Sequence, residues 1–109
     1  MKKLLAFTVV LAVAAAVSAR ADDAKDNWTN ICAKCHGADG KGQTRMGQRL
    51  KVRDYTDAKV QASFKDDEAF KAIKEGLKSA DGKTQMKPYD TLSDDQIKAL
   101  VAYTRSFKK

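Results

Sequence analysis

The chain has 109 residues, of which 43% are hydrophobic and 32% charged, and its formal net charge is +7. A chain of this length holds one small domain. Its lysines alternate with aspartates and glutamates and do not gather in runs with aromatic residues, which argues against nucleic-acid binding.

Residues 1–21 have the pattern of a cleavable signal peptide. Two lysines come first, residues 4–17 form an apolar run, and residues 19–21, Ala-Arg-Ala, match a small-x-small cleavage site. The apolar run is shorter than the ~20 residues that span a bilayer, which makes an uncleaved membrane anchor the less favoured alternative. We therefore expect a bacterial periplasmic protein whose mature domain is residues 22–109.

Residues 22–35 are predicted to form the first helix, because aspartates near its start suit the positive end of the helix dipole. Four of its residues fall at i, i+3, i+4 and i+7 on one helical face: Trp28, Ile31, Cys32 and Cys35. Both thiols of the chain therefore share a face with an aromatic and an aliphatic side chain.

Residues 32–36 spell C-x-x-C-H, the pattern of covalent haem attachment. Thiols three positions apart lie on one side of a helical turn, where they can add to the two vinyl groups of a porphyrin. The next residue can then reach the iron as its proximal ligand. We interpret Cys32 and Cys35 as the attachment points of one haem c, and His36, the only histidine, as an axial iron ligand.

Three other chemistries use two cysteines at this spacing. A thioredoxin-like redox pair needs a βαβ context, and no strand pattern precedes the motif. A structural zinc site needs four cysteine or histidine ligands, and the chain has three such residues in total. A local disulfide of an exported protein is the third alternative. The haem interpretation is favoured because C-x-x-C-H is a specific pattern in an exported chain.

A glycine-rich loop is expected over residues 37–50, which hold four of the six glycines. We interpret these glycines as allowing close backbone approach to a flat cofactor, with an ordinary flexible loop as the alternative. Further along, a short helix is expected near residues 58–62, with Thr56 or Asp57 as its N-cap. A longer helix should begin near Asp66 and end at Gly76.

Residues 77–91 show no periodicity, and no alternating strand pattern occurs anywhere in the chain. The last helix should follow Ser93, which forms an S-x-x-Q capping box with Gln96. Its apolar stripe consists of Ile97, Leu100, Val101 and Thr104, with Tyr103 beside it. The chain is thus predicted to be all-α. A domain this small has a marginal core, so we expect haem to complete the fold and the apo-chain to be largely unfolded.

These features together resemble the class I cytochromes c, in particular the short soluble bacterial ones. The resemblance rests on residues 32–36, on Met-Lys-Pro-Tyr at 86–89, and on Leu-Val-Ala-Tyr at 100–103. It implies crossed N- and C-terminal helices packed around one covalently bound haem, with Trp28 meeting Leu100 and Tyr103 at the crossing. The position of the motif near the N-terminus is unlike that of the four-helix class.

The resemblance also implies Met86 as the second axial ligand, 50 positions after His36. Met46, ten positions after His36, is the rival, and core filling is the commoner role of a methionine.

The sequence departs from the family pattern in one respect, which concerns the ring of His36. Many relatives have a proline soon after this histidine, which helps to hold the ring by a backbone hydrogen bond. Here Pro88 is the sole proline, so a carbonyl of residues 37–50 is expected to hold it.

The expected function is one-electron transfer by a monomer that is not an enzyme and has no small-molecule substrate. Its partners would be a redox-protein donor and acceptor with acidic docking surfaces, steered by lysines around the haem edge: Lys34, Lys41, Lys83 and Lys87. Two alternatives stay open. One is an electron-entry subunit of a larger oxidase or dehydrogenase, and the other is an open-site haem enzyme that binds peroxide or a gas.

Overall fold

The computed structural model describes residues 23–109, and the expected signal peptide lies outside this part of the chain. Residues 23–27 are helical and continue into a π-helical turn, η1 (Trp28–Cys32), and then into α2 (Ala33–His36). The predicted helix is therefore present, but one turn of it is wider than a regular α-helix. Such π turns are frequent at functional sites, and this one contains the first cysteine of the motif.

The segment predicted as a glycine-rich loop contains a helix, α3 (Arg45–Leu50). Thr44 caps it, because its hydroxyl oxygen accepts a hydrogen bond of 2.9 Å from the amide of Gly47. Lys51 ends it in the left-handed conformation, with φ +56°. The loop prediction was wrong for residues 45–50 because glycine has a low helix propensity, whereas contacts with the preceding helix keep Gly47 helical.

Two predicted helices in the middle of the chain are confirmed. In α4 (Ala58–Ala62) the carboxylate of Asp57 accepts from the amide of Lys59 at 2.8 Å. In α5 (Asp66–Glu75) the side chain of Glu68 accepts from the amide of Lys65, and Gly76 ends the helix with φ +78°. Local capping determines these boundaries.

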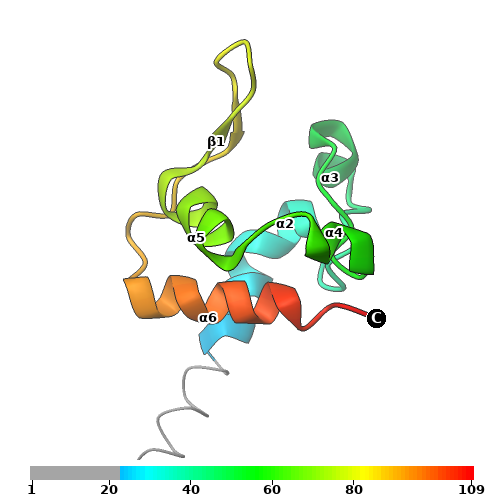
Figure 1. Ribbon diagram of the computed structural model, residues 1–109. Helices are drawn as coiled ribbons and strands as arrows, with labels where there is room; N and C mark the ends of the chain where they lie inside the picture. Colours follow the sequence, from blue (N-terminus) through cyan, green and yellow to red (C-terminus); the bar gives the residue numbers. More distant parts are fainter. Residues whose placement is uncertain (1–22) are drawn as a thin grey trace, which may run out of the picture.

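A small antiparallel hairpin, β1 (Leu77–Lys78) with β2 (Thr84–Met86), corrects the expectation of an irregular segment without strands. Leu77 pairs with Met86 and Lys78 with Thr84, with an irregularity between the two pairs. The hairpin projects from the helical body on the opposite side of α2 from α3 (Figure 1). Strands of two and three residues are too short to leave an alternating pattern in the sequence.

The last helix, α6 (Asp94–Arg105), follows the predicted capping box, in which Ser93 and Gln96 exchange side-chain-to-amide hydrogen bonds of 2.8 and 3.1 Å. Ile97, Leu100, Val101 and Thr104 are its buried residues, as expected. The first helix crosses α6 (Figure 1). At the crossing, Trp28 packs against Leu100, and its ring centroid lies 5.6 Å from that of Tyr103.

The fold is thus mostly helical, with one small sheet, as the class I resemblance implied. Its buried apolar core is small: Ala24, Trp28, Cys32, Ile97, Leu100 and Val101. Among residues 23–109, no helix is long and apolar enough to cross a membrane.

Candidate functional site

A cleft of about 930 Å³ lies beside the helix crossing and reaches from α3 to the hairpin. This volume is in the range of pockets that hold cofactors. The predicted site residues and both methionines of the described chain line it, namely Cys32, Cys35, His36, Met46 and Met86. Residues far apart in the sequence therefore meet at one cavity.

The first helix supplies the two thiols. Cys32 is buried at the end of η1 and Cys35 is half-buried in α2, and both are free thiols, so the structure does not contain the local disulfide considered above. Burial, and then the proximity of Cys35, raise the pKa of Cys32 to about 11. The Cys32 thiol is therefore protonated at neutral pH.

The imidazole of His36 lies between two aromatic rings. Its centroid is 5.5 Å from that of Trp28 and 5.5 Å from that of Tyr55, with tilts of 37° and 35°. Burial lowers the pKa of His36 below its usual value, so the ring is neutral and suited to metal ligation. Aromatic packing sets the orientation of this ring.

The expected hydrogen bond from a loop carbonyl to this ring is absent from the structure. Nδ1 of His36 is buried and has no hydrogen-bond partner among residues 23–109. The groups near the motif bind its backbone instead: the indole of Trp28 donates to the Gly37 carbonyl at 2.9 Å, and the hydroxyl of Thr44 donates to the Cys35 carbonyl at 2.8 Å. The amide of Gly42 donates to the His36 carbonyl at 2.8 Å. These bonds hold the motif in place without contacting the imidazole.

The glycines after the motif also pack against protein, which corrects the idea that they approach a cofactor. A Cβ atom added at Gly40 would lie 2.7 Å from the ring of Phe107. One added at Gly47 would collide with the carbonyl oxygens of Cys35 and Gly42. Gly47 therefore lets α3 lie directly against the turn that carries the second cysteine.

Met86 lies at the end of β2 and begins a strap, residues 86–89, that is bonded to two helices. The amide of Tyr89 donates to the Ile73 carbonyl at 2.9 Å, and the hydroxyl of Tyr89 donates to the Ile31 carbonyl at 3.3 Å. Gly76 allows the strap to pass close by, since a Cβ there would lie 2.6 Å from the Met86 carbonyl oxygen. The strap thus joins α5 to the helix that carries the thiols.

Three further aromatic residues line the cleft without having been assigned a role from the sequence: Tyr55, Phe64 and Tyr89. None of them belongs to a periodic stripe that includes the motif. Of the three, only Tyr89 belongs to a segment that carries the family resemblance, Met-Lys-Pro-Tyr at 86–89. Of the four lysines expected around the site, Lys34 and Lys87 line the cleft, whereas Lys41 and Lys83 do not.

The donor set of the cleft is compatible with haem. Two free thiols, one neutral imidazole and the thioethers of two methionines lie along its walls. Thiols, imidazole and thioether are the groups that attach and ligate a c-type haem. Among the described residues, no three His, Cys, Asp or Glu side chains gather as a metal site, which argues against zinc. Crossed helices beside a cleft with these groups are the features of a c-type cytochrome.

Comparison with known proteins agrees with this class. The cytochrome c family model matches residues 21–108, and the chain belongs to this family. A solved structure, the c-type cytochrome KustC0563, is similar with a TM-score of 0.67 and 34% sequence identity, over 78% of this chain and 96% of that one. No curated protein sequence matches this chain significantly.

Membership in the family, with the class I-like monohaem fold, establishes the cofactor as covalently attached haem c. The general activity of the family is electron transfer. Cytochromes of this kind are typically exported to the periplasm.

Proposed function

We propose that this chain is a soluble, exported one-electron carrier, in which Cys32 and Cys35 bind haem c and His36 and Met86 are its axial ligands. The observation that carries the proposal is the cleft that all four residues line. Three of them come from the first helix and its cysteine motif, and Met86 comes from a separate element, β2. A ligand set closed on both sides suits a carrier whose iron binds no substrate.

The side chains of the cleft have distinct tasks. Cys32 and Cys35 would hold the haem covalently through their sulfur atoms. His36 supplies a neutral imidazole nitrogen, and Met86 supplies a soft thioether sulfur that favours Fe(II). Once bound, haem c supplies the exchange of one electron between the ferrous and ferric states. Trp28, packed against His36, helps to exclude water from this side of the site.

The surroundings of the two methionines favour Met86 over Met46. Thr44, the cap of α3, is bonded to the Cys35 carbonyl, and Gly47 packs on the same oxygen. Met46 therefore belongs to an element that is built against the turn carrying His36. The strap of Met86 belongs to β2 and is bonded to α5 through the amide of Tyr89, and to the first helix ahead of the motif, at Ile31, through the Tyr89 hydroxyl. Met86 therefore comes from a different element than Met46 and can supply a ligand from a different side of the cleft.

The ligand proposal is tested by Met86→Ala and Met46→Ala in protein matured in a haem-attaching host. Met86→Ala should lose the weak red-end absorption band of the oxidised form, lower the reduction potential and open the iron to carbon monoxide. Met46→Ala should keep the spectrum and the potential of the parent.

An unchanged Met86→Ala protein, or a Met46→Ala protein with these changes, would contradict the assignment. A parent that already binds carbon monoxide and lacks the band would favour the open-site enzyme. Sizing of native extract tests the remaining alternative, because an electron-entry subunit would run with a larger complex, whereas the carrier should run as a monomer.

A further inference from the structure

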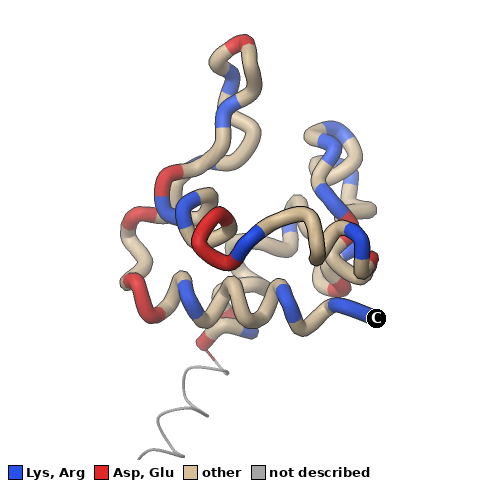
Figure 2. The backbone as a smooth tube through the Cα atoms, in the orientation of Figure 1, with Lys and Arg blue, Asp and Glu red and all other residues tan. Residues whose placement is uncertain are grey.

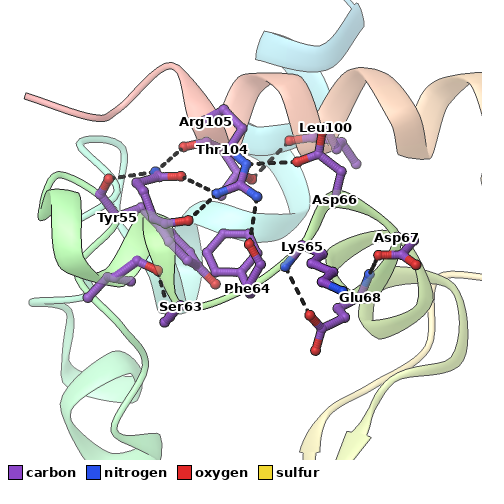
Figure 3. Close-up of polar contacts among 12 residues, drawn as sticks. Tyr55, Ser63, Phe64, Lys65, Asp66, Asp67, Glu68, Leu100, Thr104 and Arg105 are labelled. Carbon is purple, nitrogen blue, oxygen red and sulfur yellow. Dashed lines mark hydrogen bonds and ion pairs between the residues drawn. The ribbon is translucent and has the colours of Figure 1, made fainter.

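Arg105, at the end of α6, binds the segment that leads from α4 to α5. The guanidinium of Arg105 donates to the Phe64 carbonyl at 2.8 Å, to Oε1 of Gln61 at 3.0 Å and to the Gln61 carbonyl, and it pairs with the Asp66 carboxylate at 2.8 Å (Figure 3). It also stacks on the Phe64 ring, 4.1 Å from the centroid. One side chain therefore holds three residues of this segment.

Gln61 extends the network toward the cleft. It is 5% exposed, and its amide nitrogen donates to the Tyr55 carbonyl at 2.7 Å and to the Thr104 carbonyl at 2.9 Å. Arg105 bonds the other end of the same amide group. The buried glutamine thus links the backbone of Tyr55 to α6, with Arg105 satisfying its oxygen.

Polar contacts matter here because apolar burial is scarce. Gln61 is the only buried residue of α4, so this helix adds no apolar side chain to the buried core. Hydrogen bonds to charged groups are stronger than those between neutral groups. The planar fork of arginine can serve several carbonyl oxygens at once, which the ammonium of lysine cannot do in the same geometry.

The segment held by Arg105 forms part of the wall of the cleft. Tyr55 and Phe64 both line the cavity, and their rings meet edge to face with centroids 5.9 Å apart. Tyr55 in turn packs against His36. A continuous series of contacts therefore runs from Arg105 through Phe64 and Tyr55 to the proposed proximal ligand. Nδ1 of that ligand, His36, makes no hydrogen bond within the described part of the chain.

We propose that Arg105 is a positioning residue of the haem site, which holds the aromatic wall formed by Tyr55 and Phe64 against the cofactor and His36. The inference rests on the proposed function for its link to the reduction potential. Without the guanidinium, the wall would separate from α6 and admit water to the site. Water stabilises the more highly charged ferric state, so the potential would fall.

The experiment compares Arg105→Gln, Arg105→Lys and the control Asp66→Asn in haem-loaded protein. Asp66 is 72% exposed on its side chain, so its substitution removes only the outer ion pair. Redox titration should give a lower potential for both Arg105 variants and the parent value for Asp66→Asn. NMR spectra should show displaced Tyr55 ring and His36 signals in the Arg105 variants alone.

Arg105→Lys keeps a positive charge and serves as the test if Arg105→Gln does not accumulate. An Arg105→Lys protein with the potential and Tyr55 signals of the parent would overturn the proposal, even if its melting temperature fell. Equal changes in Asp66→Asn would also overturn it. A parent without a reversible redox couple would contradict the proposed function instead, and the Tyr55 signals would still decide the role of Arg105.

Discussion

Asp54 shows how a single side chain can stabilise the turn before α4. Its carboxylate accepts from the hydroxyl of Thr56 at 2.6 Å and from the amide of Thr56 at 2.9 Å. The hydroxyl bond first, and the amide bond second, lower the pKa of Asp54 below its usual 3.8. Hydrogen bonds to the charged form have this effect because protonation would weaken them.

A pH dependence of stability follows from that shift. Because the pKa of Asp54 is lower in the folded protein than in the unfolded chain, its contribution is present above about pH 4 and is lost as the pH falls through the folded value. Replacing Asp54 by Asn should therefore destabilise the holoprotein more at neutral pH than in acid. Denaturant unfolding of both proteins across this range measures the difference, and a difference that is independent of pH would exclude the mechanism.

Glycine at position 47 illustrates a residue whose role depends on its neighbour. In an ordinary helix, glycine is less favourable than alanine by about 1 kcal/mol. Here the missing side chain makes room for the carbonyl oxygen of Cys35. Composition alone favours a flexible loop here, but Gly47 lies in the helix α3. Its close contact with the motif outweighs the low helix propensity of glycine.

At the scale of elements, the contact between the first helix and α6 centres on Trp28. The indole is 3% exposed, and its ring centroid lies 4.9 Å from that of Phe107 as well as close to those of Tyr103 and His36. Its N–H is satisfied by the Gly37 carbonyl. One side chain thus joins the helix crossing, the C-terminal residues and the ligand ring.

Truncation of this residue should be costly. Trp28→Ala should destabilise the holoprotein by about 3–5 kcal/mol, as for other large aromatic side chains in cores, and reduce its yield sharply. Trp28→Phe keeps an aromatic ring but loses the indole hydrogen bond, so its loss should be smaller, with about 1 kcal/mol from that bond. Thermal unfolding of both variants measures whether Trp28→Ala is less stable than Trp28→Phe. A Trp28→Ala protein that melts like the parent would contradict the contact.

At the scale of the whole molecule, basic and acidic residues are interspersed along the described chain (Figure 2), and the basic ones are in excess. Removing the three basic residues of the expected signal peptide from the 21 in the chain leaves 18, against 14 acidic residues, a net charge of about +4. Two haem propionates would lower this further. We propose that the excess steers an acidic redox partner, with Lys34 and Lys87 nearest the cofactor because they line the cleft.

Electron transfer to an acidic partner should therefore slow as ionic strength rises toward ~0.15 M, where the Debye length is about 8 Å. The double variant Lys34→Gln/Lys87→Gln should be slower at low salt and less sensitive to added salt. Lys25→Gln/Lys98→Gln removes the same charge from residues that do not line the cleft and should change the rate less. Stopped-flow rates with a negatively charged partner measure this. A rate that is flat or rises with salt would mean that the lysines are only solvated surface.

Much of this protein can be predicted from its sequence because the determining signals are local. The spacing of Cys32, Cys35 and His36 identifies the haem motif within a few residues. Ser93 and Gln96 set the start of α6, and Gly76 sets the end of α5, through bonds inside or next to each helix. Even the crossing of Trp28 with Tyr103 followed from family resemblance, and the structure confirms it.

Contacts between separate segments decided the features that local signals do not predict. The hairpin exists because Leu77 pairs with Met86 across a turn, and α3 exists because Thr44 and Gly47 pack on the Cys35 carbonyl. The aromatic wall of the cleft depends on Arg105, some 40 residues away from the segment that it holds. No periodicity in the sequence reveals such contacts, since they form only when separate segments are brought together. The sequence by itself therefore determined the cofactor chemistry and the main helices, whereas the surroundings of His36 were decided by tertiary packing, because its neighbours come from elements that are separate in the chain.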